Sequence, residues 1–271
     1  MKLNRRDFIT GAAAFAATSS FASPVASLLG ESGVRFTDDY NGWDDSTAKL
    51  YIQDGLIAMW DGIENAGWGT HDPNATVWKD LVGGCDCEVV NGPATWGDEY
   101  FQGNHSTFFK GLSTAIPQAI SAGRFHLDIC LDFKTVPTSV DAYRQQGQFG
   151  VMGSSTSNRL LCPIWSYAGN IYTTVRNTET RVVNSIGLRE GTYTYALDSS
   201  GYQEIFGTRY SLGVGSYSLS SATITLGSFG ELLLKYCTYS KIFNIRLYNR
   251  SLDDSEKAVN DAIDKERFDL P

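Results

Sequence analysis

A nine-residue segment near the middle of the chain, residues 125–133, constrains the fold more than any other part of the sequence. Its odd positions hold Phe, Leu, Ile, Leu and Phe, and its even positions hold His, Asp, Cys and Asp. Successive side chains of a strand point to opposite faces of a sheet. The alternation therefore predicts a strand with one face in the core and the other toward solvent or a groove.

Further segments with the composition of strands recur along the chain between turn residues. We predict strands at residues 56–60, 87–90, 107–109, 124–136, 148–152, 160–165, 171–175, 181–186, 191–197, 203–208, 222–226 and 241–248. This spacing predicts an all-β fold, a two-sheet β-sandwich or jelly roll. Two helices are expected, at residues 112–121 and 255–267, and Asp253 with Glu256 forms a capping box at the start of the second.

The N-terminus has the pattern of an export signal. Asn4-Arg5-Arg6-Asp7-Phe8 precedes a weakly apolar stretch of small residues that ends near residue 22, as in twin-arginine signal peptides. The stretch is shorter than the roughly 20 apolar residues of a membrane span. We therefore predict an export signal (1–27), a linker (28–54) and one sandwich domain (55–271), with the mature protein in the periplasm, outside the cell or at its surface.

The net charge limits the expected class of partner, and the cysteines limit the expected disulfides and metal sites. A net charge of −8 argues against nucleic acid, because phosphate binding needs clustered Lys and Arg. In an oxidising compartment the five cysteines, at positions 85, 87, 130, 162 and 237, permit up to two disulfides of undetermined connectivity. The Cys85-Asp86-Cys87 spacing is too short for a usual zinc site, and no second ligand pair follows.

Two segments resemble laminin-G-like domains of the concanavalin A-like lectin and glucanase superfamily. The first is Gly-Leu-Ile-Ala-Met-Trp-Asp-Gly-Ile at 55–63, which leads to Trp-Lys-Asp-Leu at 78–81. The second, residues 243–256, is similar to the closing strand and helix of that family. The resemblance covers roughly residues 55–268 and implies a concanavalin A-like jelly roll. It also implies recognition of a carbohydrate or glycoprotein, often with calcium, although a shared fold does not fix function.

The strand at 125–133 lacks the carboxylate pattern of retaining glucanases of this fold. Those enzymes place Glu-x-Asp-x-x-Glu on one strand facing the groove. Here Asp128 and Asp132 share a face, but their backbones are about 13 Å apart at about 3.3 Å per residue. No Gly-x-Ser-x-Gly elbow accompanies the three histidines. We therefore predict no catalytic residues and no enzyme activity.

The loop at residues 65–74 combines an aromatic side chain with polar groups, as sugar sites do. Trp68 lies between two glycines and could stand exposed as a stacking platform, or could fold over the edge of the sandwich. The predicted ligand-binding residues are Trp68, His71, Asp72, Asn74 and Trp96.

Calcium is the one cofactor that the sequence allows, since it needs six to eight oxygen ligands. The candidate ligands are Asp61, Asp72, Asn74 and Asp80, with solvated turn residues as the alternative. No other cofactor is expected.

Together these observations predict an exported carbohydrate- or glycoprotein-binding module without catalytic residues. The first alternative is a structural or assembly protein of the cell surface that binds protein partners. The second is a glycoside-active enzyme of the same superfamily with unusual catalytic groups. A broad aromatic patch would favour assembly, and a concave site with converging polar groups would favour sugar.

Overall fold

The computed structural model describes residues 47–134, 146–153, 159–165, 171–175, 190–199, 202–205, 208–211, 221–228 and 237–270. The predicted export signal, most of the predicted linker and the strand predicted at 181–186 lie outside these residues. None of the helices in the described ranges is long and apolar enough to cross a membrane.

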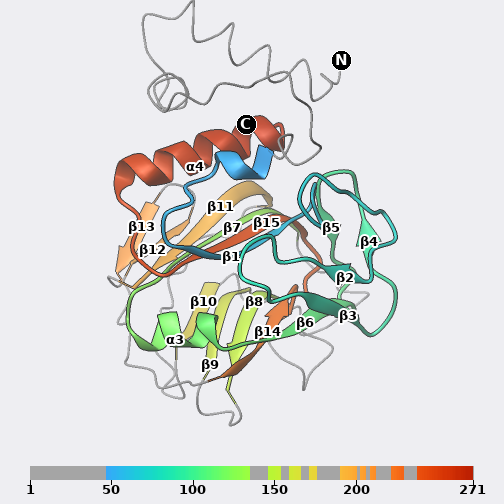
Figure 1. Ribbon diagram of the computed structural model, residues 1–271, viewed down its shortest axis with the longest axis horizontal. Helices are drawn as coiled ribbons and strands as arrows, with labels where there is room; N and C mark the ends of the chain where they lie inside the picture. The colour runs from blue at the N-terminus through green and yellow to red at the C-terminus, as the bar shows by residue number, and fades with distance from the viewer. Residues whose placement is uncertain are drawn as a thin grey trace, which may run out of the picture.

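Two antiparallel sheets stack face to face (Figure 1). The eight-stranded sheet has the order β13 (Thr208–Ser211), β12 (Tyr202–Ile205), β11 (Gly191–Asp198), β7 (His126–Phe133), β15 (Lys241–Tyr248), β5 (Phe101–Gln102) and β4 (Thr95–Trp96), with β1 (Leu56–Asp61) also paired to β15. The seven-stranded sheet has the order β10 (Ile171–Val175), β9 (Arg159–Trp165), β8 (Gln146–Met152), β14 (Ala222–Leu226), β6 (Phe108–Ser113), β3 (Cys87–Val90) and β2 (Val77–Trp78).

Three short helical elements complete the described structure: the 3-10 helix η1 (Thr47–Leu50), α3 (Ala115–Ser121) and the C-terminal α4 (Asp254–Arg267). The prediction of an all-β, two-sheet sandwich with a short C-terminal helix is confirmed. The predicted capping box is present, because the Asp253 carboxylate accepts the Glu256 amide at 2.9 Å and the Glu256 carboxylate accepts the Asp253 amide at 3.0 Å.

The core between the sheets is formed by the apolar face of β7 and its partners. Leu127, Ile129 and Leu131 are fully buried, which confirms the predicted core face of this strand. Aromatic contacts join the two sheets, since the ring of Trp60 on β1 lies 6.3 Å from that of Phe149 on β8. Burial of such rings removes large apolar areas from water and is the main stabilising contribution here.

Some predicted boundaries were wrong. Leu112 and Ser113 end strand β6, and helix α3 begins only at Ala115. The segment predicted as one strand at 203–208 is two paired strands, β12 and β13. Strands β2, β4 and β5 have two residues each, which is too short for an alternating pattern to be recognised.

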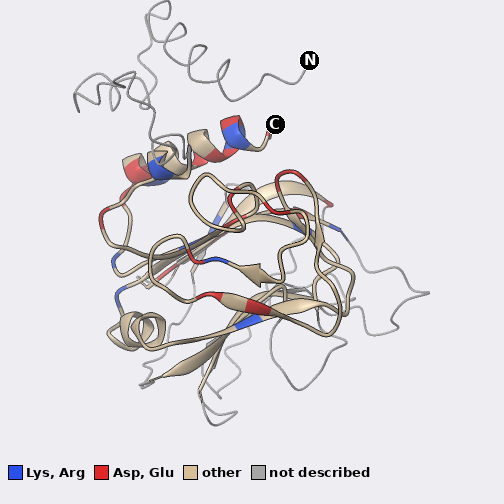
Figure 2. Ribbon diagram, turned by 45° about the vertical axis from the view of Figure 1, so that its right-hand side comes forward, with Lys and Arg blue, Asp and Glu red and all other residues tan. Residues whose placement is uncertain are grey.

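Helix α4 covers the outer face of the eight-stranded sheet (Figure 1). Val259 and Ile263 on its inner side join an apolar cluster with Met59 and Tyr248. Both acidic and basic residues occur along the helix, with Asp254 and Glu256 in its first turn and Lys265 and Arg267 in its last (Figure 2). Because α4 lies over this face of the sheet, His126 and Cys130 on the polar side of β7 are 0% exposed.

Candidate functional site

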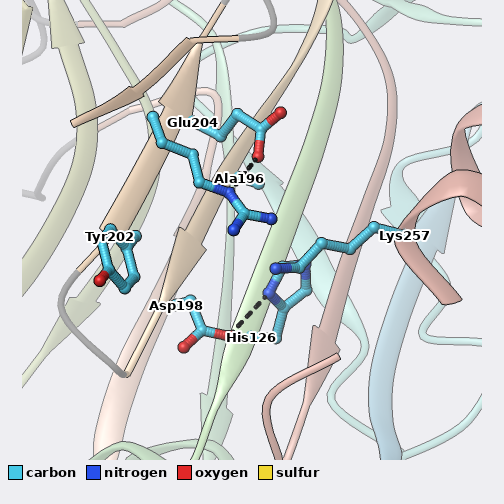
Figure 3. A pocket seen from close by; sticks show the side chains of 7 residues that line it. His126, Ala196, Asp198, Tyr202, Glu204 and Lys257 are labelled. Carbon is cyan, nitrogen blue, oxygen red and sulfur yellow. Dashed lines mark hydrogen bonds and ion pairs between the residues drawn. The ribbon is translucent and has the colours of Figure 1, made fainter. Parts of the chain in front are cut away.

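Strand register brings three polar side chains into one row on the outer face of the eight-stranded sheet. His126 on β7 lies opposite Asp198 on β11, which lies opposite Tyr202 on β12. Paired residues of a ladder share a face of the sheet. Their side chains therefore converge on the same side, under the first turns of α4 (Figure 3).

The next row is parallel to the first and contains Asp128, Ala196, Glu204 and Arg209 on four adjacent strands. Alanine at the centre of this row leaves room between the longer side chains around it. The resulting hollow is small and open to solvent. It is lined by His126, Ala196, Asp198, Tyr202, Glu204, Arg209 and Lys257.

His126 forms the floor of the hollow and is held by two carboxylates. Its Nε2 lies 2.8 Å from Asp128 Oδ1, and its Nδ1 lies 3.2 Å from Asp198 Oδ2. Burial alone would lower the pKa of His126, but the carboxylates of Asp128 and Asp198 outweigh it and raise the pKa to about 9. At neutral pH both ring nitrogens therefore carry protons and donate to the carboxylates.

Asp128 is ionised beside this imidazolium. Burial would raise its pKa, but the charges of His126 and Arg246 lower the pKa to about 2. Asp198 is held from a second side, since the Ser251 hydroxyl donates to its Oδ1 at 2.9 Å. The two carboxylates therefore have fixed positions on either side of the ring.

The centre of the outer face is a buried ion pair that anchors α4. Arg246 is 0% exposed and donates to both carboxylate oxygens of Asp264, at 2.6 and 2.8 Å. Asp264 also accepts the Tyr51 hydroxyl at 2.6 Å and the Asn244 amide at 2.9 Å. Burial would lower the pKa of Arg246, yet Asp264 keeps it well above the usual value. These groups hold the helix to the sheet and leave little space for a ligand.

A second ion pair anchors the end of α4. Arg267 donates to Asp61 at 2.6 and 3.1 Å and to Glu64 at 3.3 Å. Both carboxylates lie near the end of β1, so this contact connects the first described strand to the last helix.

The hollow opens to solvent at the edge formed by β12 and β13. Arg209 bridges Glu204, at 3.2 Å, and Asp254. The Tyr202 side chain is 47% exposed. Asp198 and Glu204 occupy diagonal positions on the paired strands, which places their backbones about 7–8 Å apart. The exposed ring of Tyr202, the carboxylate of Glu204 and two cations thus meet at this edge, next to the buried carboxylate of Asp198.

The five predicted ligand-binding residues do not line this hollow. Trp68 is half-buried against the apolar cluster of Met59 and Tyr248, with Lys49 Nζ 5.8 Å from the centre of its ring. Trp96 is half-buried and donates from Nε1 to the Ala75 carbonyl at 2.9 Å.

Hydrogen bonds shape the rest of that loop. His71 Nδ1 lies 3.1 Å from the Gly62 carbonyl, and Asp72 Oδ1 accepts the Asn74 amide at 2.8 Å. Ligand binding by Trp68, His71, Asp72, Asn74 and Trp96 stays a prediction.

Two of the candidate calcium ligands have structural partners. Asp61 is paired with Arg267, and Asp80 accepts backbone amides from Met59, Val82 and Cys85 at 2.9–3.0 Å. Within the described ranges, no group of three or more His, Cys, Asp and Glu side chains could hold a metal ion. Calcium binding by Asp61, Asp72, Asn74 and Asp80 stays a prediction.

The sequence analysis did not single out Asp198, Glu204, Arg209 or Lys257. Only the register of β11, β12 and β13 and the position of α4 bring these residues together. The available clue was the polar side of β7, where Asp128 was expected to face solvent or a groove. Instead it is 4% exposed, because α4 covers it.

No family model matches the sequence, and no curated protein matches it. Among solved structures, Trypanosoma rangeli sialidase in complex with sialic acid matches 78% of this chain and 33% of that chain, with a TM-score of 0.54 and 12% identity. The complex of the same sialidase with the inhibitor DANA matches 82% and 37%, with a TM-score of 0.54 and 13% identity. The chain thus spans about a third of the length of these sialidases, and the similarity is one of fold over that part.

The similarity corrects one prediction. We predicted a binding module without catalytic residues, whereas the solved structures of similar fold are sialidases, which are glycoside hydrolases. The resemblance to laminin-G-like domains stays a prediction.

Proposed function

We propose that this chain is a glycoside-active protein that holds a sugar unit at the mouth of the hollow between α4 and the edge formed by β12 and β13. The observation that carries the proposal is the accessible ring of Tyr202 beside two carboxylates, Asp198 and Glu204, on one face of the sheet. Sugar rings stack on aromatic faces, and their hydroxyls bond to charged groups. The hollow itself is small, so the sugar would lie at its mouth against the exposed ring of Tyr202.

Two carboxylates on one face of the sheet support a role in glycoside chemistry, because glycosidases use a pair of carboxyl groups at the scissile bond. Asp198 and Glu204 occupy diagonal positions on β11 and β12, with their backbones about 7–8 Å apart. Asp198 is fixed by His126 and Ser251, whereas Glu204 lies at the solvent side with Arg209.

The cations of the hollow indicate which glycosides to test first. Arg209 and Lys257 lie at its rim and would suit a sugar that carries a carboxylate. The similar sialidase structures contain sialic acid and DANA, so sialosides belong in the first panel. The twin-arginine pattern at the N-terminus supports placing this activity outside the cytoplasm.

The test uses the full chain with a panel of fluorogenic glycosides, including a sialoside, and with natural glycans assayed by mass spectrometry. The variants are Asp198→Asn, Glu204→Gln and Tyr202→Ala, and the matched control is Glu88→Gln, an exposed carboxylate on β3. We expect either carboxylate change to slow hydrolysis by about 10²-fold or more, Tyr202→Ala to raise KM, and Glu88→Gln to have no effect. Sugar binding without turnover would overturn the proposal, as would turnover that both carboxylate variants retain.

A further inference from the structure

Two cysteines separated by one residue point into the same part of the core. Cys85 is 4% exposed and Cys87 is 0% exposed. Asp86 between them points outward, where its carboxylate contacts Lys79 Nζ at 2.5 Å and accepts the Asp80 amide at 3.1 Å. The backbone is thus held with both thiols on the inner side.

The two sulfurs share the space above Gly111 on the neighbouring strand β6. A Cβ placed on Gly111 would lie 2.8 Å from Cys87 Sγ and 3.2 Å from Cys85 Sγ. These two distances together put the sulfurs within about 6 Å of each other. The absence of a side chain at this position therefore leaves a small volume in which the two sulfurs can meet.

We propose that Cys85 and Cys87 are a reversible dithiol–disulfide pair whose oxidant is a small-molecule disulfide such as oxidised glutathione. Cys85, which retains some exposure, attacks one sulfur of the oxidant as a thiolate, forms a mixed disulfide and releases one thiol. Cys87 then loses its proton and attacks the Cys85 sulfur, which forms the Cys85–Cys87 bond and releases the second thiol. Two cysteine thiols are oxidised and one external disulfide is reduced to two thiols.

Hydrogen bonds of the Cys85 backbone also fix the pair to the core and to the neighbouring loop. The Cys85 carbonyl accepts the indole N–H of Trp60 at 3.1 Å, and the Cys85 amide donates to Asp80 at 3.0 Å. Burial raises the pKa of the Cys87 thiol, which slows its attack and favours Cys85 as the first sulfur to react. A bond across one intervening residue closes a small ring, and strained disulfides are readily reduced, so we expect the reaction to be reversible.

The other described cysteines occupy different surroundings. Cys130 lies on the outer face of the eight-stranded sheet beside Phe243 and Phe268. Cys237 lies in a bridge with Ser228, and its carbonyl is 2.8 Å from His105 Nδ1. All four described cysteines are free thiols in the structure.

The experiment equilibrates the full chain in buffers of oxidised and reduced glutathione, both by refolding and in the native state. Acid quenching, alkylation in denaturant and trypsin digestion then isolate one peptide, residues 80–110, that contains both cysteines between Lys79 and Lys110. We expect this peptide to take up no label and to be about 2 Da lighter after oxidation, and to take up two labels after reduction.

Two variants provide the controls. The Cys130→Ala/Cys237→Ala double variant should behave as the unaltered chain does, because the bond forms within one peptide. Cys85→Ser should leave Cys87 as a single alkylatable or glutathione-linked thiol. Two labels on the peptide at every ratio of oxidised to reduced glutathione would overturn the proposal, as would a bond from either cysteine to another part of the chain.

Discussion

Replacing Asp264 with alanine is expected to lower the free energy of unfolding by about 3–5 kcal/mol, the usual cost of removing one partner of a buried ion pair. Asp264 has a side chain that is 1% exposed and accepts two hydrogen bonds from Arg246 and one from Tyr51. Without it, the buried guanidinium of Arg246 keeps a carboxylate contact with Asp128 at 3.4 Å. That distance is too long to replace two bonds of 2.6 and 2.8 Å.

Urea unfolding followed by circular dichroism measures this loss of free energy, and thermal unfolding measures the matching change in Tm. For a domain of this size, 1 kcal/mol corresponds to about 2–4 °C in Tm, so Tm should fall by about 6–20 °C. The matched control is Lys79→Ala, which breaks an ion pair whose side chains are 45% and 40% exposed and should cost less than about 1 kcal/mol.

A double variant tests the reason for the loss. Arg246→Met/Asp264→Ala removes both charges of the pair, so it should recover about half of the stability lost in Asp264→Ala. Equal costs for Asp264→Ala and Lys79→Ala would refute the assignment of α4 docking to this ion pair. A double variant less stable than the single one would show that lost packing, and not an unpaired charge, is the cause.

Two further predictions concern pH and the helix start. The pKa of about 9 for folded His126 lies above the ordinary value of about 6.5, so its stabilising contribution is complete below pH 6.5 and is lost as the pH rises through 9. The free energy of unfolding should therefore fall by about 3 kcal/mol more in the unaltered chain than in His126→Gln between pH 6.5 and 10; equal slopes would contradict this. Asp253→Ala should lower Tm by about 2–4 °C through loss of the capping box, whereas Asp253→Asn, which can still cap, should not; differential scanning calorimetry distinguishes the two.

The sandwich could be predicted because each strand carries its own periodic pattern. The alternation at residues 125–133 identified the core face of β7 without any knowledge of its neighbours. What packs against the polar face of β7 could not be predicted in the same way. It depends on contacts such as Asp128 with Arg246 and Asn260, which join positions more than a hundred residues apart, and on the docking of α4.

The candidate site was missed for a related reason. Asp198, Glu204 and Arg209 come from three strands, and a shift of one residue in their register would turn each side chain to the opposite face. The local pattern drew attention instead to Trp68, for which the sequence allowed either an exposed ring or a ring folded over the edge of the sandwich. Gly67 and Gly69 adopt positive φ angles of 126° and 68°, and Trp68 packs against the apolar cluster under α4, as the alternative of a folded-over ring anticipated.

On the outer face of the eight-stranded sheet, fully buried side chains lie close to exposed ones. This difference in burial determines which variant tests the proposed function most cleanly. His126 and Arg246 are 0% exposed, whereas the Arg209 side chain is 43% exposed. Asp198 belongs to the rigid part through His126, so Asp198→Asn should affect both stability and turnover. Glu204 is paired at the surface, where such a pair contributes at most about 1 kcal/mol. Glu204→Gln should therefore lower turnover while leaving the unfolding midpoint nearly unchanged, and a loss of turnover with that profile cannot be attributed to misfolding.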